Sequence, residues 1–93
     1  MQFECDDAKN RENCDKHGIS FEEVRPLFAT DYAVEYDGDR DEDRFIAIGP
    51  VDARLVFVVF TEPSSETIRI ISARDATLRE ARRYRAYKEG IEP

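Results

Sequence analysis

Apolar residues recur with a strand-like pattern in the middle and later parts of the chain. They alternate with polar residues over 32–36, and further apolar segments cover residues 44–48, 55–61 and 67–73. The run LVFVVF is apolar at every position, which is typical of a central strand covered on both faces. A turn from Pro50 to Arg54 and other short turns separate these segments. The pattern predicts an antiparallel sheet of three or four strands, and Phe3 suits a short extended stretch at the start.

A first helix is predicted from Asp6 or Asp7 to about Lys16. Either aspartate can cap it, and Gly18 suits the left-handed position that ends a helix. The segment has no strong apolar stripe. At 100° per residue, one face about 100° wide gathers two cations, an amide and the only histidine of the chain, which are Lys9, Lys16, Asn13 and His17.

A second helical segment follows at once. Ser20 and Glu23 have the spacing of a capping box, and apolar residues recur after them at helical intervals. Pro26 removes a backbone donor inside this segment. We therefore expect a short or kinked element that ends near Phe28.

The last helix is predicted from Asp75 or Thr77 to about Lys88, with Glu80 placed to complete a second capping box. Its apolar arc holds Ala81, Tyr84 and Tyr87, and the opposite side holds Arg79, Arg82, Arg83 and Arg85. Residues 69–88 carry seven Lys or Arg and two acids, a net charge of +5. Three explanations for this basic segment stay open: an RNA ligand, an acidic partner, or the acidic half of the protein itself.

Composition limits the choice of class. The chain has 93 residues, a net charge of −7 and 38% charged residues, which suits one small domain with a sheet and amphipathic helices. Residues 1–43 carry a net charge of −9 and residues 44–93 a net charge of +2. Overall acidity argues against nucleic-acid binding by the whole surface, but it leaves room for a local basic cleft.

No metal or cofactor site is expected. Cys5 and Cys14 lack the spacing of a zinc site, and we interpret both as reduced packing residues. The acidic loop from Asp37 to Asp43 resembles the start of a calcium loop, but the required Gly and the final Glu are replaced by Glu42 and Ile48. With no signal peptide and no apolar run of membrane length, the sequence indicates a cytoplasmic protein.

The remaining chemistry is that of acid–base groups and cations. His17 can act as an acid or base, or it can simply occupy a helix C-terminus. Arginine suits a phosphate that gains charge in a transition state, which makes Arg69 and Arg74 candidates. The alternative is that such an arginine pairs with Glu62 or with the acidic N-terminal half of the chain. In a regular strand these two arginines face opposite sides, so a bulge or the strand's end must reorient Arg74. Metal-free RNA cleavage fits these groups, because the RNA brings its own nucleophile, the 2′-hydroxyl.

Three ordered blocks of sequence carry a family resemblance. They are FECDDAKNRENCDKHGISFEE, RFIAIGPVDARLVFVVFTE and IRIISARDAT. Nearly the whole chain resembles the BrnT toxins of bacterial type II toxin–antitoxin systems. The resemblance implies a single toxin domain over residues 1–93 of the α+β class. The implied fold is RelE-like, with two N-terminal helices, an antiparallel sheet of three or four strands and a basic C-terminal helix.

The implied activity is that of an endoribonuclease that needs no metal and arrests growth by cutting RNA. The implied partner is a BrnA-type antitoxin with a ribbon-helix-helix domain, through which alone the toxin would reach operator DNA. A homodimer within that complex is compatible with the resemblance. The alternative is a non-catalytic, degenerate toxin-like module that acts only through its antitoxin and the control of its operon.

Residues are carried over by position. The catalytic candidates are His17, Glu62, Arg69 and Arg74, with either His17 or Glu62 moving protons. The carried-over RNA-binding candidates are Lys9, Asn13 and Lys16, and the arginine face of the last helix adds Arg79, Arg82 and Arg83. We expect the polar face of the first helix and the two strand arginines to converge on one cleft. The chain departs from the family pattern at Cys5, usually an aromatic residue, at Ala53, usually glycine, and at Pro26.

Overall fold

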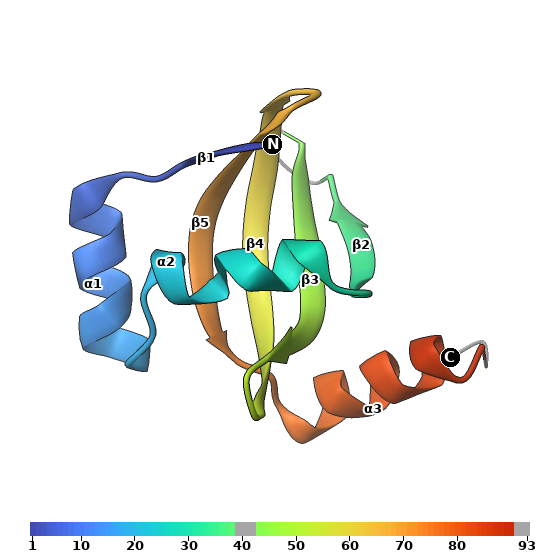
Figure 1. Cartoon of the computed structure of the whole chain (residues 1–93). Helices are drawn as coiled ribbons and strands as arrows, with labels where there is room; N and C mark the ends of the chain where they lie inside the picture. The colour runs from blue at the N-terminus through green and yellow to red at the C-terminus, as the bar shows by residue number, and fades with distance from the viewer. Residues whose placement is uncertain (39–42, 91–93) are drawn as a thin grey trace.

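The structure is a computed structural model that describes residues 1–38 and 43–90. In chain order its elements are β1 (Gln2–Glu4), α1 (Asp7–His17), α2 (Phe21–Val24), the 3₁₀ helix η1 (Arg25–Ala29), β2 (Ala33–Asp37), β3 (Arg44–Val51), β4 (Arg54–Ser64), β5 (Thr67–Asp75) and α3 (Leu78–Lys88). Figure 1 shows α2 and η1 crossing one face of a sheet, with α1 beside β5 and α3 at the far end of the strands. The predicted α+β class is confirmed.

Within the described residues, five strands form one sheet in the order β1-β5-β4-β3-β2. β2 to β5 pair antiparallel in sequence order, but β1 adds a strand that runs parallel to β5. The prediction of three or four antiparallel strands is therefore corrected to a five-stranded mixed sheet. β1 has three residues, too few to show an apolar period, and its partner lies at the other end of the chain.

The strands also extend further than the apolar pattern indicates. Pro50 continues β3 and Arg54 opens β4, so the predicted turn narrows to Asp52 and Ala53. Asp52 has a φ of 54°, in the left-handed region that aspartate tolerates better than most residues. Most of the predicted acidic loop, residues 39–42, lies outside the described residues.

Local capping sets the ends of the helices as predicted. Asp6 caps α1, and Gly18, with a φ of 68°, ends it. Ser20 and Glu23 complete the capping box of α2. Pro26 lies in η1, where the chain tightens after α2, so the short, kinked element is confirmed.

One face of the sheet, which we call the core face, is covered by α2 and η1 (Figure 1). Its large side chains are closed off from solvent, and Phe28 packs its ring against Phe3, Tyr32 and Phe60. The buried cluster includes Ile19, Phe21, Val24, Leu27, Val56, Val58, Phe60, Ile68, Ile70 and Ala73. Burial of this apolar area is the main source of stability.

The opposite face, which we call the second face, is covered only in part. α3 packs against β2 and β3 and leaves side chains of β4 and β5 half-buried. The helical wheel places Arg83 among the outward arginines, but in the structure Arg83 forms an ion pair with Glu35 and is turned toward the sheet. Tyr87 and Lys88 both bind the carboxylate of Asp31, which fixes the end of α3.

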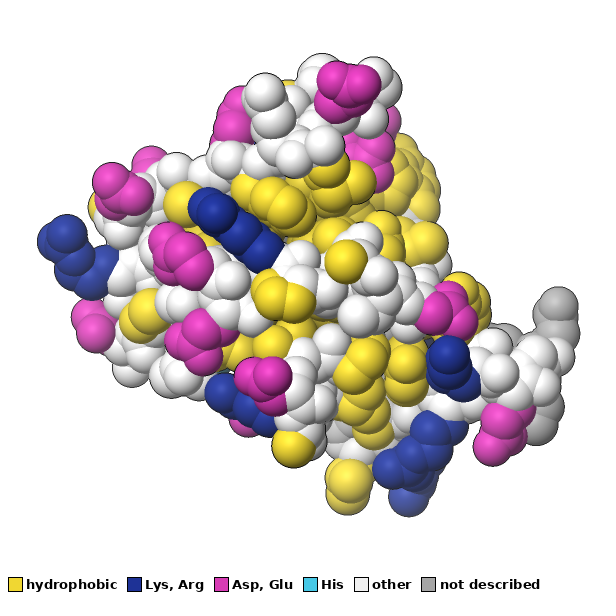
Figure 2. Space-filling view, viewed as in Figure 1, with side chains coloured by type: hydrophobic (Ala, Val, Ile, Leu, Met, Phe, Trp, Pro, Cys, Tyr) yellow, Lys and Arg dark blue, Asp and Glu magenta, His cyan; other side chains and the backbone are white. Residues whose placement is uncertain are grey.

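Charged side chains of both signs cover the surface. Figure 2 shows acidic and basic side chains interspersed over the α1 and α2 part of this view, and basic side chains along α3. Cys5 and Cys14 are both free thiols, as expected. In the described part of the chain, no helix is long and apolar enough to cross a membrane.

Candidate active site

A β-bulge interrupts the pairing of β5 with β4. Ile70 lies opposite Phe60, but Ser72 lies opposite the adjacent Val59. Ile71 is therefore an extra residue on β5. Such a bulge reverses the alternation of side chains on the strand beyond it.

The bulge brings the two strand arginines to one face. Arg69 lies opposite Thr61 and Arg74 opposite Phe57, and residues 57 and 61 of β4 project from the second face. The sequence required a bulge or a strand end before the two arginines could act together. The bulge at Ile71 meets that condition.

Arg74 is held in a bidentate ion pair by Glu80. Its Nη1 and Nη2 donate to the two carboxylate oxygens at 2.8 and 2.9 Å, and Nη1 also donates to the carbonyl oxygen of Asp75. Its Cζ lies 4.0 Å from the centre of the Phe57 ring, a cation–π contact. The hydrogen bonds of the pair raise the pKa of Arg74 and lower the pKa of Glu80, so both groups stay charged.

One side of the Arg74 guanidinium remains open. The group has five N–H donors, and Glu80 takes the fork formed by Nη1 and Nη2. Within residues 1–38 and 43–90, no acceptor meets the Nε–H or the second N–H of Nη2. These two donors form another fork, of the kind that binds a phosphate or carboxylate. Arg74 can therefore bind an anion without leaving Glu80.

Glu80 is placed by the start of α3. Its backbone N–H donates to the hydroxyl of Thr77 at 3.2 Å, and its carboxylate accepts from the backbone N–H of Thr77 at 2.9 Å. The side chain of Glu80 is 12% exposed, which makes it a firm anchor for Arg74. The sequence predicts the capping box but not the ion pair. The available signal was an arginine six residues before a capping glutamate.

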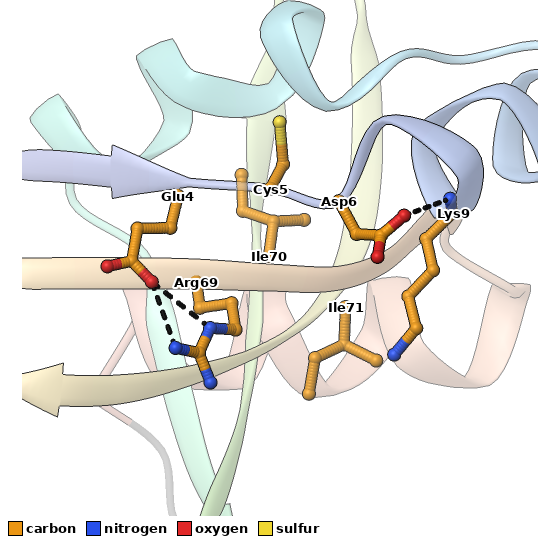
Figure 3. A pocket seen from close by; sticks show the side chains of 7 residues that line it. All are labelled: Glu4, Cys5, Asp6, Lys9, Arg69, Ile70 and Ile71. Carbon is orange, nitrogen blue, oxygen red and sulfur yellow. Dashed lines mark hydrogen bonds and ion pairs between the residues drawn. The ribbon is translucent and has the colours of Figure 1, made fainter.

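Arg69 lies at one end of a groove with a volume of about 390 Å³. Its Nε and Nη2 donate to one oxygen of Glu4, at 3.2 and 2.9 Å. Figure 3 shows this pair facing across the groove, with the Lys9 side chain extending from α1 toward Ile71. Arg69 and Arg74 are thus bound by two different carboxylates, one from β1 and one from α3.

A second groove, of about 230 Å³, runs between α1 and β5. It shares Lys9 and Ile71 with the first groove. Its lining holds the predicted polar face of α1 and the strand residue next to the bulge, namely Lys9, Glu12, Asn13, Lys16, His17, Ile71 and Ser72. Of the α1 candidates, Lys9 therefore shares a groove with Arg69, whereas Asn13, Lys16 and His17 line the neighbouring groove. Arg74 lines neither groove and lies two residues beyond Ser72.

Asn13 has a different position from its neighbours on α1, because it is buried. Its Nδ2 donates to the carbonyl oxygens of Ile19 and Ala73 at 2.9 and 2.8 Å, and its Oδ1 accepts from the N–H of Ala73 at 3.1 Å. Neither amide hydrogen is left for RNA. Asn13 instead ties α1 to β5 and so holds the groove together.

Glu62 is separated from the strand arginines. It follows Thr61 on β4, so alternation directs its side chain toward the core face. Burial, and secondarily the charge of Glu62, raises the pKa of Tyr32, which packs against the core. Glu62 lines neither groove.

The arginines of α3 divide into two kinds. Arg79 and Arg82 are exposed and make no ion pair with any residue that the structure describes. Arg83 is engaged by Glu35. Arg79 and Arg82 are therefore free to meet a ligand, and so is Arg85, which is also exposed and has no ion pair among the described residues.

Two residues of the second face had no signal in the sequence. The Nε of Arg44 and the Oγ1 of Thr61 are buried and make no hydrogen bond within the described part of the chain. Arg44 is the first residue of β3, and Thr61 lies opposite Arg69. Their relation depends on strand register, which the sequence does not reveal.

Comparison with known proteins identifies relatives of this chain. Residues 5–80 match the family model described as the ribonuclease toxin, BrnT, of a type II toxin–antitoxin system. Among solved structures, the chain is similar to the crystal structure of the Brucella abortus ribonuclease toxin BrnT. The TM-score is 0.67 and the identity 26%, over 83% of this chain and 97% of that one. None of the curated proteins compared matches the chain.

Proposed function

Because the chain belongs to the BrnT family of ribonuclease toxins of type II toxin–antitoxin systems, we propose that it is an endoribonuclease that cuts RNA without a metal ion and arrests growth. The proposed cleft is the second face of the sheet where it borders α1. The observation that carries this proposal is Arg74, a guanidinium fixed by Glu80 and Phe57 that keeps one fork of donors open.

In the proposed reaction, the 2′-hydroxyl oxygen attacks the neighbouring phosphorus and the bond from phosphorus to the 5′-oxygen breaks. Negative charge builds up on the non-bridging phosphate oxygens. The open fork of Arg74 stabilises that charge by bidentate, charge-assisted hydrogen bonds. Because Glu80 already fixes the guanidinium, little reorganisation is needed when the charge develops.

The reaction also needs a base for the 2′-hydroxyl proton and an acid for the departing 5′-oxygen. We assign both roles to His17, which lines the groove that contains Ser72, two residues from Arg74. Glu62, the other candidate, is directed to the core face. The RNA backbone is attracted by Lys9 and Lys16 in the groove and by Arg79 and Arg82 on α3.

A type II toxin has a protein antitoxin as its partner. We propose that this partner is a BrnA-type protein with a ribbon-helix-helix domain, and that the toxin meets operator DNA only through it. The exposed arginines of α3 offer an acidic antitoxin segment a complementary surface. Binding there would also compete with RNA.

The test is cleavage of end-labelled RNA in EDTA. Wild-type protein is expected to cut it and to leave a 2′,3′-cyclic phosphate, and a 2′-deoxy substitution at the cut position should block the cut. Arg74→Ala should lower kcat by about 10²–10³, as expected for the loss of one preorganised transition-state donor. The control is Arg25→Ala, which removes the same charge from η1, on the core face. Activity that disappears in EDTA, or that survives in Arg74→Ala, would contradict the proposed mechanism.

The alternative function is a toxin-like module without catalysis. One observation favours it: Arg69 and Arg74 are each already bonded to a carboxylate. Such a protein would bind the antitoxin as an active toxin does, but it would leave RNA intact and would not stop growth when produced alone. Measuring growth after induction without the antitoxin separates the two functions.

A further inference from the structure

Three polar side chains form a row across the second face, near the end of the sheet where β3 begins and β4 turns into β5. Phe45 of β3 lies opposite Phe60 of β4, and both rings stack on the core face. The next residues, Arg44 and Thr61, are therefore neighbours that project from the second face. Thr61 in turn lies opposite Arg69 of β5. Adjacent strands are about 5 Å apart, so the two arginines begin about 10 Å from each other with Thr61 between them.

The charges of the described strand residues in this row have the two acids at its ends and the two arginines toward its centre. Asp37 lies opposite Arg44 at one end of the row, and Glu4 lies opposite Arg69 at the other. Glu4 binds Arg69, whereas no ion pair joins Arg44 to any acid that the structure describes. Two guanidinium groups that flank Thr61, one from β3 and one from β5, repel each other unless an anion lies between them.

The same place also holds unused hydrogen-bonding groups. The Nε of Arg44 and the Oγ1 of Thr61 are buried, and in the described residues neither has a partner. Thr61 as a whole is 2% exposed. Buried polar atoms without partners are rare in native proteins, and each one calls for an explanation. Here the two residues that carry them are neighbours on β3 and β4, and Arg69 follows on β5.

We propose that Arg44 and Arg69, with Thr61 between them, form a binding site for a phosphate of the RNA backbone. Arg69 and Arg74 are five residues apart on β5, which is about 15 Å along the strand. The phosphate at this row is therefore a different one from the scissile phosphate at Arg74. The row fixes the register of the RNA, and Arg44 is a binding residue that the sequence did not single out. This inference rests on the proposed ribonuclease function.

The experiment measures binding of a single-stranded 2′-O-methyl RNA, which cannot be cut, at several salt concentrations. The variants are Arg44→Ala, Arg44→Lys and Arg11→Ala. Arg11 is exposed on α1, outside both grooves, and its variant is a charge-matched control. Loss of a charged bidentate contact should weaken binding by Arg44→Ala about tenfold. One phosphate contact fewer should also lower the slope of log K against log salt by about 0.7.

Arg44→Lys keeps the charge and should restore the salt slope but only part of the affinity, because an ammonium cannot bind bidentately. This variant also keeps the test decisive if Arg44→Ala fails to fold. Arg11→Ala should bind like the wild type. Equal affinity and slope in wild type and both Arg44 variants would overturn the inference, even if wild type cleaves RNA normally.

A second readout separates this inference from the proposed function. In this readout, single phosphates of a cleavable RNA are replaced one at a time by neutral methylphosphonates. At one position away from the cut, the replacement should lower the activity of the wild type. The same replacement should not lower the activity of Arg44→Ala any further, because that variant already lacks the contact. If wild type neither binds nor cuts RNA, the proposed function fails. If wild type cuts RNA but Arg44→Ala weakens only the complex with the antitoxin, the row belongs to a protein interface and the inference is wrong.

Discussion

The two faces of one sheet are built from alternate residues of the same strands, yet they differ in kind. On the core face, Phe21, Leu27 and Phe60 are at most 1% exposed. On the second face, Arg74 is half-buried, and the Nε of Arg44 is buried without a hydrogen-bond partner in the described chain. The first face uses apolar area for stability, and the second holds charge at a half-open surface. A 93-residue domain can carry such a charged face because the other face supplies a complete core.

The largest effect is expected on the core face. Phe60→Ala removes a ring that packs against both Phe28 and Phe45, and we expect it to lower the free energy of unfolding by about 3–5 kcal/mol. Chemical denaturation followed by circular dichroism measures it. Arg74→Ala, on the second face, should instead change activity far more than stability. A similar stability loss in both variants would break the comparison of the two faces.

Asn13→Ala tests the contact that joins α1 to the sheet. It leaves the carbonyl oxygens of Ile19 and Ala73 and the N–H of Ala73 without the hydrogen bonds that Asn13 makes to them. We therefore expect the unfolding free energy to fall by about 3 kcal/mol. Lys16→Ala, on the same side of the helix but exposed, is the control and should keep its stability. If Asn13 were a direct RNA contact, its variant would instead stay stable and lose only RNA affinity.

The helix caps and Asn13 show which features of α1 and α2 the sequence predicts and which it does not. The helix caps at Asp6, Gly18 and Ser20 depend on neighbours within a few residues, and all three were predictable. The polar face of α1 was predictable from the helical period, but the burial of Asn13 was not, because its partner Ala73 lies 60 residues away.

The sheet divides in the same way. Its antiparallel strands and the extended stretch at Phe3 were predictable, whereas the pairing of β1 with β5 and the place of the bulge at Ile71 were not. Both depend on pairing between segments distant in sequence. Arg69 and Arg74 could therefore be proposed together, but their shared face needed a bulge that no local pattern reveals. Arg44 and Thr61 become neighbours only through strand register.

An intermediate effect is expected for Glu80→Gln. The pKa of Glu80 is lowered in the folded protein, mainly by its hydrogen bonds to Arg74, from an ordinary value of 4.5. The stabilisation is therefore fully present above about pH 4.5 and is lost as pH falls through the lower, folded pKa. We expect the wild type to exceed the variant by about 1–2 kcal/mol near neutral pH.

Denaturation of both proteins between pH 7 and pH 3 measures this difference. The unfolding free energies of the wild type and of Glu80→Gln should converge as the pH falls below about 4.5. The hydroxyl of Thr77 can cap α3 in both proteins, so the cap does not contribute to the difference. A difference that does not change with pH would mean that the charge of Glu80 does not support Arg74.

The smallest effect is expected for Arg82→Ala. Arg82 is exposed and has no ion pair in the described residues, so the unfolding free energy should change by less than about 0.5 kcal/mol. If Arg82 holds RNA, the slope of log K against log salt should fall by about 0.7. An unchanged slope would assign this part of α3 to the antitoxin alone.

The central claim is that RNA lies on the second face, beside α1. The most direct test is to follow backbone amide signals by NMR while adding a single-stranded 2′-O-methyl RNA. The signals of Lys16, Ser72 and Arg74 should shift. The signals of Val24 and Leu27, which lie in α2 and η1 on the core face, should stay in place. Shifts confined to α2 and η1, with Ser72 and Arg74 unmoved, would contradict the account.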